Sequence, residues 1–294
     1  MRKFSLYFAG AITIILFLLN FSFEPRGYYD VRPLSEINSE NNPDAYPWIS
    51  SDGLRMYYTS GKRTKKSSNE KIYYTERQST GDSFGEPKKI KLWKDESNIV
   101  SCWLSEDELN IYYKFLGIEK KIYRASRSSR KELFDSVKAI NLEGDFGGTN
   151  IGPSLTPDKK ELYIYNYIPN EKLASILIFK YEEEFKYNLD SKLLVPPGYT
   201  VFPGQLSRDG LKYYLSMEKD SVNRLYYFKR NSLNEKFSKL YKVGGEINNY
   251  TLTQVSLTAD ENILIFSCSE TKKWSNNELY AAFKRGDDEE PVEF

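Results

Sequence analysis

The chain has 294 residues, a length that suits one large all-β domain. Its 42 basic residues balance 41 acidic ones, so its net charge does not indicate nucleic acid as a partner. It contains no histidine, which excludes histidine metal ligands, Ser-His-Asp and Cys-His nucleophiles and histidine general bases. We therefore expect no metal site and no cofactor, and the composition disfavours most hydrolase mechanisms.

Residues 1–23 differ from everything that follows them. A short basic start, Met1-Arg2-Lys3, precedes a mainly apolar run of 20 residues from Phe4 to Phe23. This layout is typical of a secretory signal, yet a small-x-small cleavage site is missing and the run is long enough to span a bilayer. Two interpretations stay open: a hydrophobic helix that anchors the protein in a membrane through residues 4–23, or a cleaved signal that releases it. Both place the rest of the chain outside the cytoplasm, in the periplasm or at the cell surface.

A phrase of four residues recurs five times between residue 35 and the C-terminus. It consists of an apolar residue, a serine or threonine, any residue and an aspartate, and successive aspartates are 55, 51, 51 and 51 residues apart. The five are Asp52, Asp107, Asp158, Asp209 and Asp260. A fixed period of this size indicates a solenoid or propeller array.

Each repeat predicts four short antiparallel strands. In the first repeat, Met56-Tyr57-Tyr58 and Ile72-Tyr73-Tyr74 follow the aspartate, and the other repeats carry counterparts of these apolar and aromatic runs. The hydroxyl and the aspartate lie in the first hairpin, where their oxygens accept hydrogen bonds from backbone amides and close the turn. Four-stranded sheets repeated radially form a propeller, so we expect a five-bladed β-propeller over residues 35–294, preceded by the N-terminal hydrophobic helix.

The repeat resembles a known family. The phrase Pro153 to Asp158, with Pro47 to Gly53 beside it, is similar to the TolB-type, WD-like propeller repeat. The resemblance covers five stretches and, by repetition, nearly all of residues 28–294. It implies the propeller fold and says little about activity, because members of that family range from binding modules to propellers attached to peptidases. Glu106 and Ala259 replace the proline before the aspartate, which we interpret as turn variants.

A propeller must join its last blade to its first, and both ends of the chain are candidates. Residues 24–34 predict a tether that contains an extended segment, Tyr29 to Leu34. The C-terminal segment Glu290 to Phe294 resembles the start of the outer strand predicted for the first blade, Glu86 to Ile90. The sequence leaves open which end closes the ring.

Ligands of propellers usually contact the loops at one mouth of the central channel. Amide and aromatic side chains in these loops suit polar ligands such as sugars or peptide segments, although such residues also occur in ordinary loops. The predicted ligand-binding face comprises Asn42, Asn98, Asn150, Tyr199, Asn249, Tyr250 and Trp274.

The predicted function is a non-enzymatic, extracytoplasmic binding or scaffold propeller that recognises an envelope protein, a polysaccharide or a peptide. The alternative is a five-bladed glycosidase whose loop carboxylates, Asp44, Glu96 and Asp145, carry paired acid chemistry. The five repeated aspartates are expected to be structural, because turns spread around a ring cannot converge on one ligand. Cys102 and Cys268 fall in blades that are not neighbours, which predicts two buried free thiols.

Overall fold

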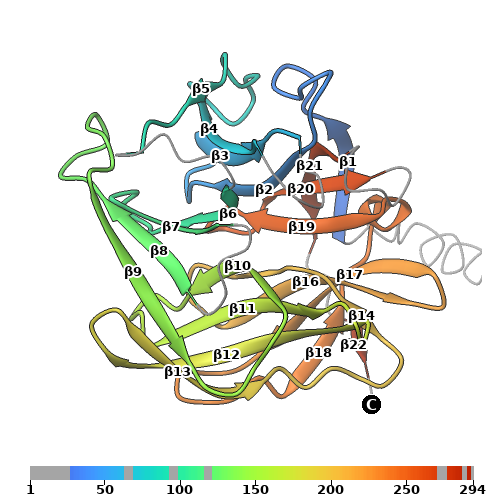
Figure 1. Ribbon diagram of the computed structural model, residues 1–294. Coiled ribbons are helices and arrows are strands. Elements are labelled where there is room, and N and C mark those ends of the chain that lie inside the picture. The colour runs from blue at the N-terminus through green and yellow to red at the C-terminus, as the bar shows by residue number, and fades with distance from the viewer. Residues whose placement is uncertain are drawn as a thin grey trace, which may run out of the picture.

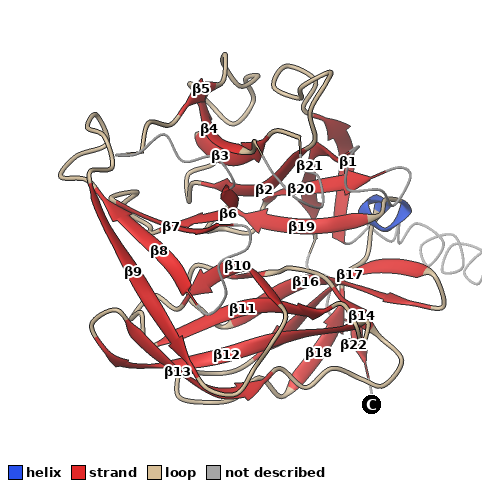
Figure 2. Cartoon of the chain, in the orientation of Figure 1, coloured by secondary structure: helices blue, strands red, loops and turns tan. Residues whose placement is uncertain are grey.

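The computed structural model describes residues 27–62, 69–92, 99–115, 121–269, 277–286 and 290–292. These residues form β-strands and one short 3-10 helix, η1 (Glu246–Asn249), as Figures 1 and 2 show. Within these ranges no helix is long and apolar enough to cross a membrane. The predicted hydrophobic segment, residues 1–23, lies outside the described residues.

The strands follow one another in five groups, which we call units 1 to 5, within the described ranges. Unit 1 comprises β2 (Asp44–Ile49), β3 (Arg55–Ser60), β4 (Lys71–Glu76) and β5 (Lys88–Lys89). Unit 2 comprises β6 (Ile99–Leu104), β7 (Asn110–Phe115), β8 (Lys121–Ser126) and β9 (Ser136–Glu143). Unit 3 comprises β10 (Thr149–Leu155), β11 (Glu161–Ile168), β12 (Leu173–Glu183) and β13 (Lys186–Lys192). Within each of these units, consecutive strands pair antiparallel.

Both chain ends pair with the last two units. Unit 4 comprises β14 (Thr200–Val201), β15 (Gln205–Leu206), β16 (Lys212–Lys219), β17 (Val222–Lys229) and β18 (Lys239–Lys242). Unit 5 comprises β19 (Leu252–Leu257), β20 (Ile263–Ser269) and β21 (Asn277–Arg285). The N-terminal strand β1 (Gly27–Pro33) pairs with β21 and is the outer strand of unit 5, whereas the C-terminal strand β22 (Glu290–Val292) pairs with β18. The N-terminal end therefore completes the last unit, and the C-terminal end adds a further strand to unit 4.

Units 2 and 3 differ from the separate four-stranded sheets that the repeat predicts. Their outer strands β9 and β13 pair in parallel, with Lys186 opposite Asn141 and Asn188 opposite Glu143, so the two units form one eight-stranded sheet. Both outer strands are long, with eight residues in β9 and seven in β13, against two in β5. This extra length lets them reach each other at the rim of the molecule (Figure 1).

The units contact one another in a closed cycle. The first strands touch in the order β2, β6, β10, β15, and β16 then contacts β19, which returns to β2. At three of these junctions a serine hydroxyl accepts a hydrogen bond from a backbone amide of the neighbouring unit. The pairs are Ser101 with Gly152 at 3.2 Å, Ser154 with Leu206 at 3.0 Å, and Ser256 with Ile49 at 3.0 Å. The last of these bonds joins unit 5 to unit 1.

The core lies between neighbouring units. Each of five buried clusters in the described structure draws its side chains from two adjacent units, and one of them packs Ile49 and Met56 of unit 1 against Ile263 and Ile265 of unit 5. Trp48 belongs to the cluster between units 1 and 2, and Trp103 packs against this cluster and against the one between units 2 and 3. Cys102 and Cys268 are buried free thiols, which confirms the prediction from their spacing.

The Ser/Thr-x-Asp turns have the same geometry in all five units. The hydroxyl donates to the aspartate at 2.5–2.7 Å, and the aspartate accepts the amide two residues later at 2.9–3.1 Å. The residue after each aspartate has a φ between 58° and 73°, which glycine supplies at Gly53 and Gly210. At four of these aspartates partial burial raises the pKa of the carboxyl, but the hydrogen bonds that it accepts outweigh this effect. The aspartates whose pKa is lowered are Asp52, Asp107, Asp158 and Asp260.

We expect these four turn aspartates to make the fold acid-sensitive. Because folding lowers their pKa, their stabilisation is complete above the unfolded value of about 4 and is lost as pH falls through the lower folded value. Asp158→Asn should reduce the free energy of unfolding by about 1 kcal/mol at pH 7, and the difference from the wild type should shrink steadily as pH falls below about 4. Urea unfolding at several pH values measures both, with the exposed Asp135→Asn as control. An equal loss at every pH would contradict this role.

Candidate functional site

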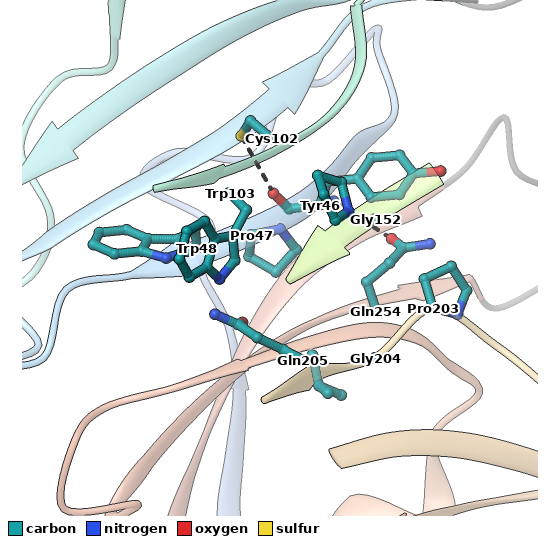
Figure 3. Close-up of a pocket in the computed structure, with 12 residues that line it drawn as sticks. Tyr46, Pro47, Trp48, Cys102, Trp103, Gly152, Pro203, Gly204, Gln205 and Gln254 are labelled. Carbon is teal, nitrogen blue, oxygen red and sulfur yellow. Dashed lines mark hydrogen bonds between the residues drawn. The ribbon is translucent and has the colours of Figure 1, made fainter. Parts of the chain in front are cut away.

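The centre of the ring is filled by side chains. Residues from all five first strands, or from the segments leading into them, enclose a cavity of only about 20 Å³ (Figure 3). The lining consists of Tyr46, Pro47, Trp48, Cys102, Trp103, Gly152, Pro153, Pro203, Gly204, Gln205, Gln254 and Val255. Such a volume holds about one water molecule and no sugar ring or peptide. None of these lining residues is a carboxylate, so paired acid chemistry has no groups here.

Arg208 closes this centre from the side of the Ser/Thr-x-Asp turns. Its guanidinium lies 4.6 Å from the ring centre of Trp48 and donates to the carbonyl of Ile49. It also lies 3.6 Å from the carboxylate of Glu106, so one side chain of unit 4 reaches units 1 and 2. Burial lowers the pKa of Arg208 to about 10. The cation therefore stays charged at neutral pH and links three units across the ring.

The residues predicted for the ligand-binding face contact their own chain wherever the structure describes their side-chain partners. Asn150 is buried and accepts a hydrogen bond of 2.8 Å from Asn166. Asn42 donates to the hydroxyl of Ser39 at 3.1 Å. Asn249 is exposed at the end of η1. Asn98 and Trp274 lie outside the described residues.

The two predicted tyrosines of that face pack on other aromatic rings. The ring of Tyr199 lies edge-on to Tyr226 with the centroids 5.8 Å apart. Tyr250 contacts Phe266 and Tyr280, at 5.9 and 5.4 Å between centroids. Both are half-buried, so each also leaves part of its ring accessible.

The carboxylates of the glycosidase alternative occupy unlike environments. Asp44 begins β2 and has no exposed surface, and its carboxylate accepts the amide of Ser39 at 2.6 Å. Burial raises the pKa of Asp44 to about 6. Asp145 is exposed in the loop between β9 and β10, and Glu96 lies outside the described residues.

A groove between units 1 and 2 has room for a ligand. Its volume is about 670 Å³, which is in the range of pockets that hold peptides and small molecules. Seven basic and three acidic side chains line it, although the whole chain is nearly neutral. The lining consists of Arg55, Tyr57, Tyr74, Glu76, Lys88, Lys89, Ile90, Lys91, Glu108, Arg127, Arg130, Lys131, Glu132, Leu133 and Phe134.

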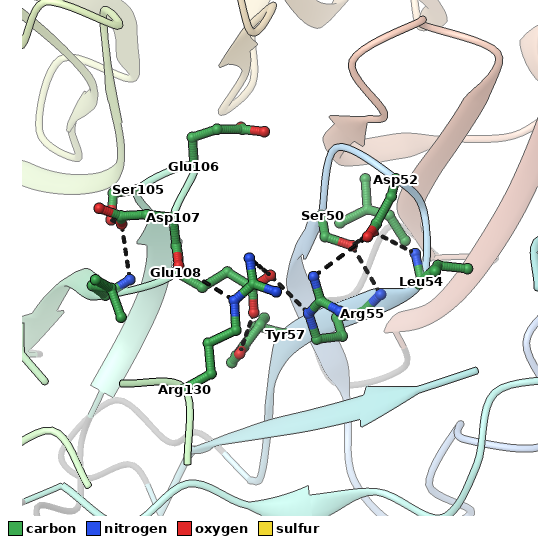
Figure 4. Close-up of polar contacts among 12 residues, drawn as sticks. Ser50, Asp52, Leu54, Arg55, Tyr57, Ser105, Glu106, Asp107, Glu108 and Arg130 are labelled. Carbon is green, nitrogen blue, oxygen red and sulfur yellow. Dashed lines mark hydrogen bonds and ion pairs between the residues drawn. The ribbon is translucent and has the colours of Figure 1, made fainter. Parts of the chain in front are cut away.

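The floor of this groove is a buried carboxylate held by cations of both units (Figure 4). Glu108 follows the turn aspartate of unit 2 and is 1% exposed. It accepts hydrogen bonds from Arg55 Nε at 2.7 Å and from the hydroxyl of Tyr57 at 2.8 Å, both in unit 1. Arg130 of unit 2 lies 3.6 Å from the same carboxylate. The negative charge of Glu108 is thus compensated by Arg55 and Arg130, and the lysines at the rim give the groove its positive potential.

A second repeated contact was missed from the sequence. Arg77, Arg127 and Arg230 each donate Nε to the backbone carbonyl of the residue after the turn aspartate, at 2.8–2.9 Å. Each guanidinium also lies 4.3–4.7 Å from the ring centre of a phenylalanine seven residues later in the chain. The phenylalanines are Phe84, Phe134 and Phe237. The arginine–phenylalanine spacing was the available signal, and it identifies a clamp between the two turns of one unit.

Comparisons with known proteins indicate a fold and no function. No protein-family model matches the chain, and no curated protein matches it. An α-L-arabinofuranosidase from Podospora anserina, solved with cellotriose, is 9% identical, with a TM-score of 0.54 over 90% of this chain and 98% of that one. TolB from Acinetobacter baumannii is 16% identical, with a TM-score of 0.48 over 85% of this chain and 57% of that one.

A gluconolactonase from Xanthomonas campestris is 10% identical, with a TM-score of 0.46 over 89% of this chain and 95% of that one. These neighbours are propeller-type proteins, and the likeness to the arabinofuranosidase supports a propeller fold for this chain. The chain spans little more than half of the Acinetobacter TolB. At 9% identity the likeness to the arabinofuranosidase shows the fold alone and assigns no activity to this chain.

We expect Asp44 to destabilise the fold at neutral pH. Burial raises the pKa of Asp44 to about 6, so the folded protein is most stable below about pH 4, where this carboxyl is protonated in both the folded and the unfolded state. Part of that stability is lost as pH rises through about 6. Asp44→Asn should therefore stabilise the protein by about 1–3 kcal/mol at pH 8 and by much less at pH 4. Thermal and urea unfolding of both proteins across this pH range measure the difference. If the effect of the substitution were the same at every pH, the pKa of Asp44 would not change on folding, and the prediction would be wrong.

We expect Glu108 to hold units 1 and 2 together. Glu108→Gln removes the charge that compensates Arg55 and Arg130 in a buried site, which should cost about 3 kcal/mol of unfolding free energy. The exposed Glu86→Gln, in the loop after β4, is the matched control and should change little. Urea unfolding measures both variants. A loss below about 0.5 kcal/mol for Glu108→Gln, the range of ordinary surface substitutions, would contradict this role.

Proposed function

We propose that this chain is a five-bladed β-propeller that binds a partner and catalyses no reaction, with the groove between units 1 and 2 as its main binding surface. The observation that carries the proposal is the contrast between the two cavities: about 670 Å³ in the groove and about 20 Å³ at the centre. A propeller whose centre is closed offers its surface rather than its channel to a ligand.

Five blades are supported by three features of the described structure. The strands fall into five groups, the first strands contact in a closed cycle, and five buried clusters lie between neighbouring groups. A TolB-type repeat is supported by the Ser/Thr-x-Asp turns, which share one hydrogen-bond pattern. An extracytoplasmic position, with a membrane anchor or a cleaved signal, rests on the sequence of residues 1–23.

The absence of catalysis is supported by the carboxyl groups of the described residues. The centre has no acidic lining, Asp44 is enclosed, and no group of three or more potential metal ligands occurs within the described ranges. In the groove, the carboxylate of Glu108 already accepts hydrogen bonds from Arg55 and Tyr57. The partner we propose is an envelope protein that meets the basic rim, and the loops around Asn249 and Tyr250 are a second candidate surface.

Crosslinking with two variants tests this function. Full-length wild type, a groove variant (Lys88→Glu with Lys91→Glu) and a mouth variant (Asn249→Ala with Tyr250→Ala) are crosslinked in their own membranes. Stoichiometric companions are then identified by mass spectrometry. We expect one companion with the wild type and the mouth variant, and its loss with the groove variant, whose unfolding temperature should be unchanged.

Other outcomes correct the proposal in defined ways. If the companion is lost only with the mouth variant, the protein still has a binding function, but the binding surface is formed by the loops around Asn249 and Tyr250 rather than by the groove. Release of arabinose from arabinose-containing oligosaccharides, abolished by Asp145→Asn, would establish the glycosidase instead. Recovery of every variant alone, with no hydrolysis, would leave the binding function without support.

A further inference from the structure

We infer that the outer edge of β18 is a second binding site, which takes an acidic, extended peptide as an added strand and is masked by the protein's own C-terminal strand, β22. The inference goes beyond the proposed function, because this edge belongs to unit 4 and is separate from the groove between units 1 and 2. A peptide that adds to a sheet edge gains affinity from backbone hydrogen bonds and specificity from its side chains.

Strand β22 is required neither by the repeat nor by closure of the ring. Unit 4 already has its first strand position filled by β14 and β15, followed by β16, β17 and β18. The outer strand of unit 5 is supplied by β1. Among the described strands, β22 is thus the one that lies outside the four-stranded pattern (Figure 1). Its position therefore shows what the edge of unit 4 accepts rather than what the fold needs.

The contact that holds β22 is small. It has three residue pairs, whereas β1 has five with β21. The three are Leu240 with Val292, Tyr241 with Pro291 and Lys242 with Glu290. Proline has no amide hydrogen, so the three residues of β22 offer β18 at most two amide donors. Val292 is half-buried, whereas Tyr28 of β1 is 1% exposed. Release of β22 therefore costs the fold much less than release of β1.

The edge of β18 suits an acidic strand that carries an apolar residue. Strand β18 reads Lys-Leu-Tyr-Lys, and Lys229 of β17 lies over the ring of Tyr241, 5.6 Å from its centre. Leu240 belongs to the buried cluster between units 3 and 4, against which Val292 packs. The segment that contains β22, residues 287–293, has five acidic residues in seven. Cations beside the edge favour carboxylates on a bound strand, and an apolar residue of that strand takes the place of Val292.

The other outer strands of the described structure differ from β18. Strands β9 and β13 pair with each other. Leu92, just after β5, forms a parallel bridge with Phe134 of unit 2. Strand β1 has an exposed Asp30 that forms an ion pair with Arg285, and this carboxylate opposes an acidic ligand. Among these strands, β18 is the one on which an added strand is seen.

The intact chain masks this edge by tethering. Four residues, 286–289, separate the end of β21 from the start of β22. A connection this short holds β22 at an effective concentration on the order of millimolar. A separate peptide at micromolar concentration competes poorly with such a strand. Binding of a partner's strand therefore requires that β22 leaves the edge.

A labelled peptide and a release variant test the inference. The probe is fluorescein-Asp-Asp-Glu-Glu-Pro-Val-Glu-Phe, which has the sequence of residues 287–294, and its anisotropy is followed as protein is added. In the full-length release variant, Val292→Asp, a charge replaces the apolar contact of β22 and frees the edge. We expect this variant to bind the probe roughly tenfold or more tightly than the wild type does. Val222→Asp, at a valine that is 47% exposed, is the matched control and should bind as the wild type does.

Two further proteins guard the test against side effects of the substitution. A chain that ends at Gly286 removes β22 without placing a charge beside the core, and it should bind the probe as tightly as the release variant. The groove substitutions Lys88→Glu and Lys91→Glu, added to the release variant, should leave its affinity for the probe unchanged. Loss of binding in that combined variant would place the peptide in the groove and overturn the inference.

An engineered disulfide shows whether β22 masks the edge of its own chain. Opposite residues of an antiparallel pair lie about 4.5–5.5 Å apart between Cα atoms, a separation that a disulfide spans. Full-length Lys242→Cys with Glu290→Cys should therefore oxidise to a monomer with an internal disulfide. A covalent dimer on a non-reducing gel would show that the strand comes from a second copy, and masking within one chain would be wrong.

The remaining outcomes separate strand addition from attraction by charge. A probe of the same sequence with N-methyl groups on alternate amides cannot complete a β-ladder and should bind the release variant roughly tenfold more weakly or not at all. Equal binding of the two probes would replace strand addition by a general attraction for acidic peptides. If neither the release variant nor the chain ending at Gly286 binds the probe more tightly than the wild type, the edge of β18 is not a peptide site. Either result leaves the function proposed for the groove untouched.

Discussion

Closure of the ring is the constraint on which the rest of the structure depends. A four-stranded sheet has two faces to bury, and each described unit buries them only against its neighbours. The cluster that contains Ile49 and Ile265 exists because unit 5 returns to unit 1. Unit 5 brings three strands from its own repeat and takes its fourth, β1, from the other end of the chain. Backbone pairing between distant segments therefore completes the last of the five cores.

Directional polar contacts set how the units lie against one another. Apolar burial supplies most of the driving force but has no preferred direction. Buried or half-buried carboxylates at three junctions supply that direction. Glu108 binds Arg55 and Tyr57, Glu161 binds Arg230 at 2.7 Å, and Glu261 binds Lys212 and Tyr214 at 2.6 and 2.8 Å. With Arg208 reaching across the centre, they define one arrangement of the units.

The same packing accounts for where a partner can bind. Residues from every unit line the centre, among them Trp48, Gln205 and Gln254, so the repeat that builds the ring also closes its channel. Function then depends on the places where the repeats differ. Unit 1 has a short basic outer strand, and unit 2 offers Arg130, Lys131 and Leu133 across from it. The groove is the product of this local irregularity, which the regular part of the fold holds rigidly in place.

Much of the fold could be predicted from the residues alone. The five Ser/Thr-x-Asp phrases identify the turns, because their hydrogen bonds join residues at most five apart in the chain. The alternating apolar runs identify the strands on either side. The arginine clamp is equally local, since Arg77 and Phe84 are seven residues apart in the chain.

The candidate site could not be predicted in the same way. Arg55 and Glu108 are 53 residues apart, and their contact depends on how two units pack rather than on any motif. Asn150 and Tyr199 look like accessible loop residues in the sequence, yet Asn150 lies in β10, and tertiary contacts with Asn166 and Tyr226 engage the two side chains. Loop composition alone does not distinguish a binding residue from one that satisfies its own chain.

The sequence by itself therefore determined the repeat, its turns and its strands, which are local consequences of hydrogen bonding and of alternation along a strand. Only the tertiary structure decided which chain end completes unit 5, that β9 and β13 join two units, and that the centre is closed while a basic groove stays open. These outcomes depend on strand edges and side chains from distant repeats competing for the same space, and that competition has no signature within any single repeat.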